Sequence, residues 1–268
     1  MKYFNNKSMK TSIKNMAMII MLSFAIISNE SCKKSEPNIT PTPYGSFYFH
    51  IHTGIGGAEV DTSTIGYDSL GRRFKLSLGQ FYINNIILKK ADGTTFPIKN
   101  TVYLLKKMSN ETYYLDSVPA GNYSSITFDV GVDDVSNHVN PANFASSSPL
   151  YIQNPSMWFG STSSGYMFMN VQGMADTSAN NNGTVNYPFT LQLGTSSDLR
   201  TVNMPSTPFT ITAKIDNYYH MMADYGKLFQ GVSFVAFNAN NNYTVSPFTS
   251  PSAATQIADN IANMFKPL

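Results

Sequence analysis

The sequence predicts an all-β protein, a single antiparallel β-sandwich with a short C-terminal helix, preceded by a signal peptide. Three observations predict this class. Short runs of alternating apolar and polar residues recur from Tyr44 onward, which is the pattern of strands with one buried face. Turn-forming dipeptides separate these runs, and a helical period is confined to the C-terminal segment. An apolar stretch too short to span a membrane lies near the N-terminus.

Residues 1–32 have the features of a bacterial lipoprotein signal peptide. Four lysines and no acidic residue precede an apolar run from Met16 to Ile27. As a helix this run spans roughly 18 Å, against about 30 Å for a bilayer core, so we expect it to direct secretion. Cys32 stands where a lipobox carries its lipidated cysteine, so we expect acyl chains there to anchor the protein to the membrane. Asn29 and Glu30 depart from the usual lipobox, which leaves an uncleaved anchor as the alternative.

The composition of residues 33–268 argues against nucleic-acid binding, intrachain disulfides and thiolate metal clusters. Residues 33–43 contain three prolines among polar residues and predict a flexible linker. Four of the 18 Lys and Arg residues lie in residues 1–32, as does one of the 16 Asp and Glu residues, so residues 33–268 carry a net charge of −1. A nearly neutral chain is not expected to bind nucleic acid. Because Cys32 is the only cysteine, the chain cannot form an intrachain disulfide or a thiolate metal cluster.

The strand pattern is clearest in the first run, where Phe47, Phe49 and Ile51 alternate with polar residues that include His50 and His52. Successive side chains of a strand point to opposite faces, so the apolar set is expected to face a core. The same pattern predicts further strands at Arg73–Ser77, Gln80–Lys89, Thr101–Lys106, Tyr123–Val132, Tyr166–Gly173, Tyr187–Leu193, Phe209–Ile215 and Val232–Phe237.

Turn signals and the C-terminal period complete the predicted domain, residues 44–268. Asp92-Gly93 and Asn182-Gly183 tolerate the positive φ of hairpin turns, and the glycine-rich Gly54–Gly57 segment is expected to be a hairpin turn as well. Apolar residues recur every three or four positions from Ala254 to Phe265, which predicts an amphipathic helix that docks on the sheet. The number and spacing of the strands favour one domain over two.

No motif predicts catalysis. The chain lacks a hydrolase elbow, a phosphate-binding loop, paired metalloprotease histidines and a cysteine–histidine zinc pattern. Asp133 and Asp134 are neighbours, and on a strand they would point to opposite faces, so we interpret them as strand-end residues that bond the loop backbone. We therefore expect a protein that is not an enzyme.

His50 and His52 are the candidate metal ligands. They lie two residues apart on a predicted strand, so both imidazoles project from one face and can chelate one ion. Two histidines on the solvent-facing side of a strand also arise without a metal role. Methionine is frequent in the domain, and its thioether suits Cu(I), but methionine more often fills gaps in a core.

An ordered set of short segments resembles the MbnP-like family, envelope proteins whose founders accompany methanobactin copper-uptake systems and which are common as Bacteroidetes lipoproteins. The resemblance covers residues 45–266. It is carried by Tyr67–Gly71, Phe81–Ile86, Ala91–Gly93, Val118–Tyr123, Val130–Asp133, Gly165-Tyr166, Leu199–Val202, Ile257–Asn260 and Met264-Phe265.

The resemblance implies a β-sandwich that handles copper in the periplasm or at the cell surface. In some members a tryptophan that a di-haem partner enzyme has oxidised joins histidines in holding Cu(I). Transferred to this chain, the resemblance implies His50, His52 and Trp158 as metal ligands and a di-haem enzyme as a partner. Trp158 stands one position away from the family's tryptophan, and Gln192 occupies the place of a family histidine.

Two other functions remain open at this point. The domain could be a metal-free structural or interaction protein of the envelope, which Gln192 and the displaced Trp158 favour. It could also be a carbohydrate-binding module, which its many Tyr and Asn residues and Trp158 suggest.

Overall fold

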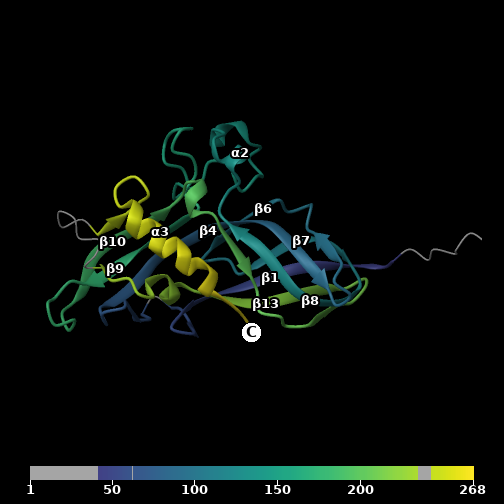
Figure 1. The fold of residues 1–268 in the computed structure, drawn as a ribbon, viewed down its shortest axis with the longest axis horizontal. Helices are drawn as coiled ribbons and strands as arrows, with labels where there is room; N and C mark the ends of the chain where they lie inside the picture. The colour runs from purple at the N-terminus through teal and green to yellow at the C-terminus, as the bar shows by residue number, and fades with distance from the viewer. Residues whose placement is uncertain (1–41, 62, 235–242) are drawn as a thin grey trace, which may run out of the picture. The chain divides into compact units, whose positions relative to one another are not determined.

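The structure, a computed structural model, describes residues 42–61, 63–234 and 243–268, and its strands form two β-sheets (Figure 1). The predicted signal peptide, Cys32 and residues 33–41 of the predicted linker lie outside the described residues. Within the described residues, no helix is both long and apolar enough to cross a membrane.

The smaller sheet has five strands and is built around β1 (Tyr44–Ile55). Its order is β15 (Phe265–Pro267), β13 (Asp216–Asp224), β1 and β2 (Ala58–Glu59), and β7 (Thr112–Pro119) also pairs with β1. One edge of β1 pairs with β13 from Ser46 to Gly54, and the other edge is shared by β7 and β2.

The larger sheet has ten strands and is built around β4 (Arg73–Lys90), which pairs with five of the other nine. The main order runs β11, β8, β4, β9, β10, β14, while β12 joins β8 and β3, β5 and β6 join β4. Their bounds are Gly66–Tyr67 (β3), Thr95–Pro97 (β5), Tyr103–Lys107 (β6), Gly121–Val130 (β8), Met169–Asp176 (β9), Val185–Leu193 (β10), Arg200–Asn203 (β11), Phe209–Ile211 (β12) and Thr244–Val245 (β14).

The sheets are mixed, so the expectation of a purely antiparallel arrangement is wrong. β1 pairs parallel with β13, and β10 pairs parallel with β14. In each pair the partners are separated by long stretches of chain, so no tight hairpin imposes an antiparallel direction. Alternation of apolar and polar residues looks the same for either direction, and the sequence pattern therefore could not show it.

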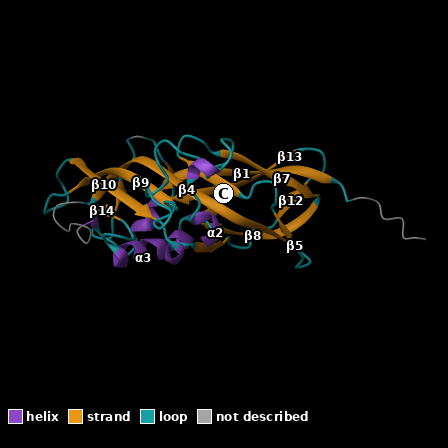
Figure 2. Cartoon of the chain, turned by 90° about the horizontal axis from the view of Figure 1, so that it is seen from above, coloured by secondary structure: helices purple, strands orange, loops and turns teal. Residues whose placement is uncertain are grey.

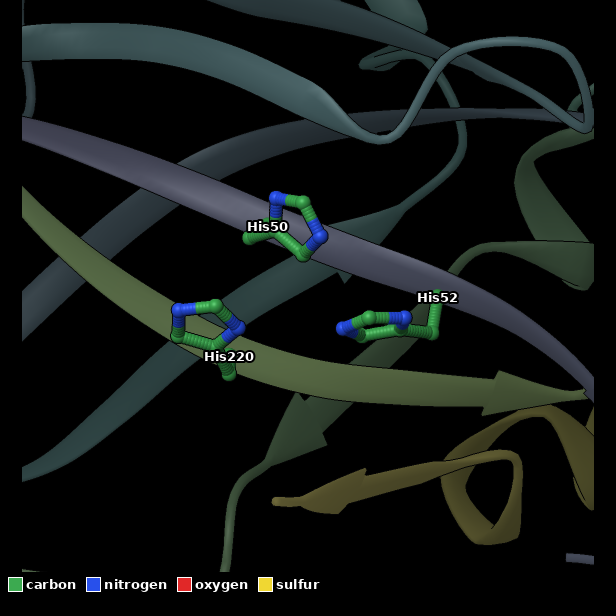
Figure 3. Close-up of side chains that lie close together, drawn as sticks. All are labelled: His50, His52 and His220. Atoms are coloured by element: carbon green, nitrogen blue, oxygen red, sulfur yellow. The ribbon is translucent and has the colours of Figure 1, made fainter. Parts of the chain in front are cut away.

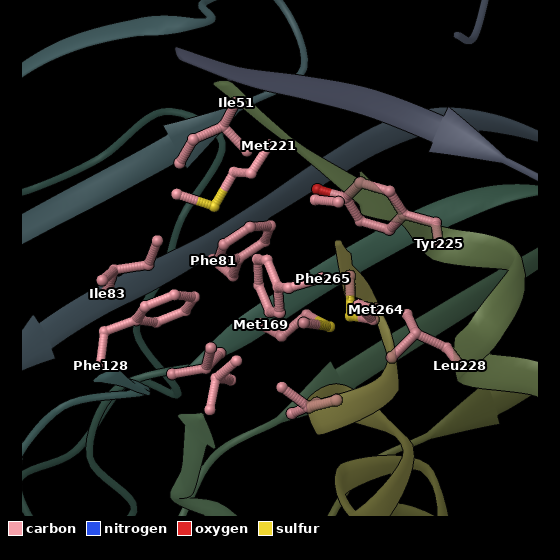
Figure 4. Close-up of a cluster of buried hydrophobic side chains, with 14 of the residues drawn as sticks. Ile51, Phe81, Ile83, Phe128, Met169, Met221, Tyr225, Leu228, Met264 and Phe265 are labelled. Carbon is pink, nitrogen blue, oxygen red and sulfur yellow. The ribbon is translucent and has the colours of Figure 1, made fainter. Parts of the chain in front are cut away.

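Aromatic rings from both sheets meet in one core (Figure 4). The rings of Phe49 on β1 and Phe128 on β8 are 6.0 Å apart, and Phe265 of β15 contacts Phe128 at 5.0 Å and Phe81 of β4 at 5.6 Å. Edge-to-face and tilted contacts of this kind add to the stabilisation from burial itself. The apolar face predicted for the first strand is thus the face that packs against the larger sheet.

The helices are short. α3 (Pro251–Asp259) buries Ala254, Ile257 and Ala258 against the larger sheet near β10 and β14 (Figure 2), which confirms the docked C-terminal helix. The helix ends earlier than predicted, because a 3₁₀ turn (Asn260–Asn263) follows it and Phe265 belongs to β15. The second helix, α2 (Asp134–Asn137), is capped by the Asp133 carboxylate, which accepts the Ser136 N–H.

Three further 3₁₀ segments lie in the described part of the chain. They are η2 (Pro141–Asn143), η3 (Ser196–Asp198) and η4 (Tyr225–Phe229).

Several predicted strands differ from those observed. Arg73–Ser77 and Gln80–Lys89 form one strand, β4, with a register shift between Leu76 and Leu78. The predicted strand Phe209–Ile215 stops at Ile211. Residues 232–234 are not in a strand, and the rest of Val232–Phe237 lies outside the described residues. The sequence interpretation missed β7 and β13, which flank β1 on its two edges.

The turn at the end of β1 is a hairpin, as predicted. Gly56 and Gly57 adopt φ of 63° and 86°, the left-handed region that a tight hairpin turn requires and that glycine enters without strain. The Asp224 carboxylate accepts both glycine N–H groups at 2.9 Å. This hairpin carries β2 back along the edge of β1.

The shared core gives a stability prediction. Ile51 is fully buried on the inner face of β1, whereas Ile215 is 53% exposed beside β13. Ile51→Ala should lower the free energy of unfolding by about 2–5 kcal/mol, because it removes buried methyl groups and leaves a cavity. Ile215→Ala should change it by about 0.5 kcal/mol or less. Urea unfolding of the two variants measures the difference, and equal effects would show that the inner face of β1 is not part of the core.

Candidate metal centre

Three histidines gather on the outer face of the smaller sheet, two from β1 and one from β13. The parallel register places His50 directly opposite His220 and His52 opposite Met222. Because side chains alternate along a strand, these residues share the face opposite the core, while Phe49 and Ile51 point inward. Figure 3 shows the three imidazoles turned toward a common space.

The distances within this histidine cluster are short. One nitrogen from each of His50, His52 and His220 lies within 4.8 Å of the others. The ring centroid of His50 is 4.5 Å from that of His52 and 4.7 Å from that of His220. The ring centroids of His52 and His220 are 6.0 Å apart. His50 and His52 are partly buried, whereas His220 is exposed, so an ion could enter from solvent.

Two carboxylates border the cluster on the β7 and β2 edge of β1. Glu111 Oε2 lies 3.5 Å from His50 Nε2 and 3.7 Å from His52 Nδ1. The Glu59 carboxylate touches His52 Nδ1 without the geometry of a hydrogen bond, and among the described residues this buried nitrogen has no hydrogen-bond partner. His50 Nδ1 is 2.9 Å from the Thr112 hydroxyl, which orients the ring.

These neighbours act on His50 in opposite directions. Burial lowers the pKa of the His50 imidazole below its ordinary value of 6.5, and His52 and His220 lower it further. Glu111 and Glu59 oppose this shift without cancelling it. The neutral form, which is the one that donates a lone pair to a metal, is therefore favoured in the folded protein.

The donor set fits a transition-metal ion. Imidazole nitrogen is a good ligand for copper, zinc, nickel and iron, and three imidazoles supply most of a tetrahedral shell. Nitrogens bound to one ion at about 2.0–2.1 Å lie roughly 3.3 Å from one another, so the rings need only close in from their present separation. A carboxylate beside the ring nitrogen that does not bind the ion is the usual support for a ligating imidazole, and Glu59 stands in that position beside His52 Nδ1 if His52 binds through Nε2.

The structure places the other predicted site residues elsewhere. Trp158 packs edge-to-face on Tyr166 at 4.8 Å, in a second apolar cluster with Tyr82 and Met157, and lines a pocket there. The structure does not bring Trp158 together with His50 and His52. Gln192 is partly buried on β10, in register with Asn170. The role of His50, His52 and Trp158 as metal ligands stays a prediction.

Sequence reasoning missed His220. Its strand was not predicted, yet Tyr219, Met221 and Ala223 are buried on one side of β13 while Tyr218 and His220 are exposed on the other. This alternation was the available signal. The fourth histidine, His138, lies at the end of α2, where Nδ1 is 2.6 Å from the Thr162 carbonyl oxygen and Nε2 is 3.7 Å from Asp134.

The lowered pKa of His50 predicts how the metal-free protein responds to acid. In the unfolded chain a histidine binds a proton near pH 6.5, whereas His50 in the folded protein binds it only at lower pH. Below about pH 6.5 the unfolded state thus holds more protons, and folding stability falls as the pH falls toward the folded pKa. His50→Gln cannot titrate and should lose less stability than wild type between pH 7.5 and 5.5.

Urea unfolding at the two pH values measures this, with His138→Gln as the matched control that should behave as wild type. Equal losses in wild type and His50→Gln would contradict the assigned shift.

Comparisons with known proteins bear on the whole domain. A comparison with curated proteins finds no match. Among solved structures, MbnP from Methylosinus trichosporium is similar, with a TM-score of 0.53 over 76% of this chain and 81% of that chain, at 14% sequence identity. Such a likeness shows a shared fold. The family model for MbnP matches residues 44–247, which is most of the described domain. The chain therefore belongs to the MbnP family, as its ordered motifs predicted.

Proposed function

We propose that this chain is an envelope lipoprotein that binds copper through His50, His52 and His220. The histidine cluster is the single observation that carries the proposal, because three imidazole nitrogens converge within 4.8 Å on a rigid sheet. Membership of the MbnP family supports copper as the ion, since that is the role the family resemblance implies. The protein holds its ion and does not catalyse a reaction.

The sheet holds the ligands in place before an ion arrives. His50 and His220 are fixed opposite each other by the backbone pairing of β1 and β13, and His52 follows two residues along the same strand. The Thr112 hydroxyl orients the His50 ring through Nδ1. Little side-chain freedom then remains to be lost on binding, which favours affinity. His50, His52 and His220 would hold copper through one ring nitrogen each.

Trp158 and a di-haem partner enzyme stand outside this proposal. The Trp158 ring contacts Tyr166 and borders a different pocket, so it does not supply a ligand next to the histidines. The histidine cluster needs no modified tryptophan to reach three ligands.

The metal-free envelope protein remains the second candidate. The observation that favours it is that the histidines already have carboxylate neighbours, Glu111 for His50 and Glu59 for His52, which could stabilise the sheet without an ion. The carbohydrate-binding module gains no support here. Tyr48 and Tyr218 stack on each other, with ring centroids 5.0 Å apart and planes 21° apart, so those faces are not free for a sugar.

Metal binding is tested by unfolding with and without copper. A ligand present at 100 times its Kd raises the free energy of unfolding by about 2.7 kcal/mol when it binds the folded state alone. The variant with His50, His52 and His220 changed to Ala should lose this stabilisation, while His138→Ala should keep it. The measurement is the thermal midpoint of each protein with Cu(I) and with Cu(II). Equal stabilisation of wild type and the triple variant would show that these three histidines do not bind copper. If copper does not stabilise wild type, the metal-free candidate is favoured.

The membrane anchor is tested separately. Cys32 follows the apolar leader and is the only thiol in the chain, so we propose it as the site of lipidation. Cys32→Ala should abolish incorporation of a fatty-acid analogue and release the protein from the membrane fraction or leave it uncleaved. Labelling of the variant at the level of wild type would show that the anchor lies elsewhere.

A further inference from the structure

We propose that Glu59 and Glu111 shift the preference of the histidine cluster toward divalent transition-metal ions, such as Cu(II) and Zn(II), and away from singly charged Cu(I). This inference rests on the proposed function and names the charge state that the site takes. Three things support it: the position of the two carboxylates, the buried groups that hold the neighbouring backbone, and the dependence of Coulomb energy on the charge of the ion.

Both carboxylates lie against the histidine rings. Glu111 Oε2 lies between the two histidines of β1, at 3.5 Å from His50 Nε2 and 3.7 Å from His52 Nδ1. Glu59 contacts His52 Nδ1. Within the described part of the chain, the ion pairs of both glutamates are with these histidines alone. An ion bound by the three rings would therefore lie close to two negative charges.

The edge of β1 explains why two separate segments deliver glutamates to one place. β7 pairs with β1 only as far as His50, and β2 begins to pair at Gly54. The Glu111 carbonyl oxygen accepts the Ile51 N–H at 2.8 Å, and the Val60 N–H donates to the Thr53 carbonyl oxygen at 3.0 Å. The gap beside His52 is thus closed by Glu111 from one side and by the end of β2 from the other.

Two buried charges hold the turns that carry the glutamates. The Lys106 ammonium, which is fully buried, donates to the carbonyl oxygens of Lys107 at 2.7 Å and Asn110 at 2.9 Å, next to Glu111. Burial lowers the pKa of Lys106 to about 8 and Glu111 opposes this, so the ammonium stays charged at neutral pH. Asp224, only 2% exposed, binds the Gly56 and Gly57 N–H groups of the hairpin that leads to Glu59.

The charge of the ion decides how much the carboxylates contribute. Coulomb energy is proportional to each charge, so a carboxylate attracts a divalent ion twice as strongly as a monovalent ion at the same place. Binding affinity depends exponentially on binding energy. The factor by which a carboxylate increases the affinity for a divalent ion is therefore about the square of the factor by which it increases the affinity for Cu(I).

The ligand types agree with this preference. Imidazole with carboxylate suits Cu(II) and Zn(II), and Cu(II) stands above Zn(II) in the usual affinity order, whereas Cu(I) prefers thiolate and thioether sulfur. Met222 is the thioether opposite His52, but its side chain packs over Gly54, where an added Cβ would lie 2.5 Å from Met222 Sδ. The sulfur is therefore held against β1 beside the hairpin.

The test compares affinities for Cu(II), Zn(II) and Cu(I) in wild type, Glu59→Gln, Glu111→Gln and the double variant. Competition with chromophoric chelators gives each Kd, and Cu(I) is measured under reducing, anaerobic conditions. Each single change should weaken Cu(II) and Zn(II) binding about 10- to 100-fold, the usual effect of losing a carboxylate that supports a ligating histidine. By the square relation, Cu(I) binding should weaken only about 3- to 10-fold. Asp134→Asn, which removes the carboxylate beside His138, should change none of the three.

The outcomes separate this inference from the proposed function. If the Gln variants lose no affinity, or lose the same factor for Cu(I) as for Cu(II), while binding still depends on the three histidines, the inference is wrong and the copper site stands. If wild type binds neither Cu(I) nor a divalent ion in a histidine-dependent way, both are wrong. A loss for the divalent ions that is close to the square of the loss for Cu(I) supports the inference.

Discussion

The parallel pairing of β1 with β13 is the constraint on which both the core and the histidine cluster depend. It sets Phe49 opposite Tyr219 and Ile51 opposite Met221 on the buried side, and by the same register His50 opposite His220 on the outer side. A slip of one residue would turn the apolar set of a strand outward and the histidines inward, at the cost of the core. Burial of the inner face therefore fixes the geometry of the outer one.

The edge of β1 opposite β13 adds two charged groups to this geometry. β7 and β2 share that edge. Glu111 immediately precedes β7 and Glu59 ends β2, and both carboxylates lie beside the rings. Burying a charge is costly unless it is well bonded. The Lys106 ammonium donates to the carbonyl oxygens of Lys107 and Asn110 and to the Thr53 hydroxyl, and the Asp224 carboxylate accepts the Gly56 and Gly57 N–H groups. These hydrogen bonds tie down the chain on either side of the two glutamates.

Sequence patterns predicted the part of the site that lies within one element. His50 and His52 follow from a period of two on a single strand, and the alternation around them is strong because Phe47, Phe49 and Ile51 are large and apolar. His220 comes from a strand far along the chain, and no turn links the two strands to reveal the pairing. Glu59 and Glu111 were equally hidden, since each reaches the site through a turn whose direction depends on tertiary contacts. The motifs predicted the family correctly, but they could not show that Trp158 packs with Tyr166 away from the histidines.

The central claim is that the three histidines hold the metal, and the most direct measurement is the position of copper in a crystal of the copper-loaded protein. Diffraction data on either side of the copper absorption edge give an anomalous difference map in which only copper contributes strongly. We expect one peak on the outer face of the smaller sheet, about 2.0–2.1 Å from a nitrogen of each of His50, His52 and His220, the length of an ordinary bond between imidazole nitrogen and such an ion. A peak beside Trp158, or no peak at the histidines, would contradict it.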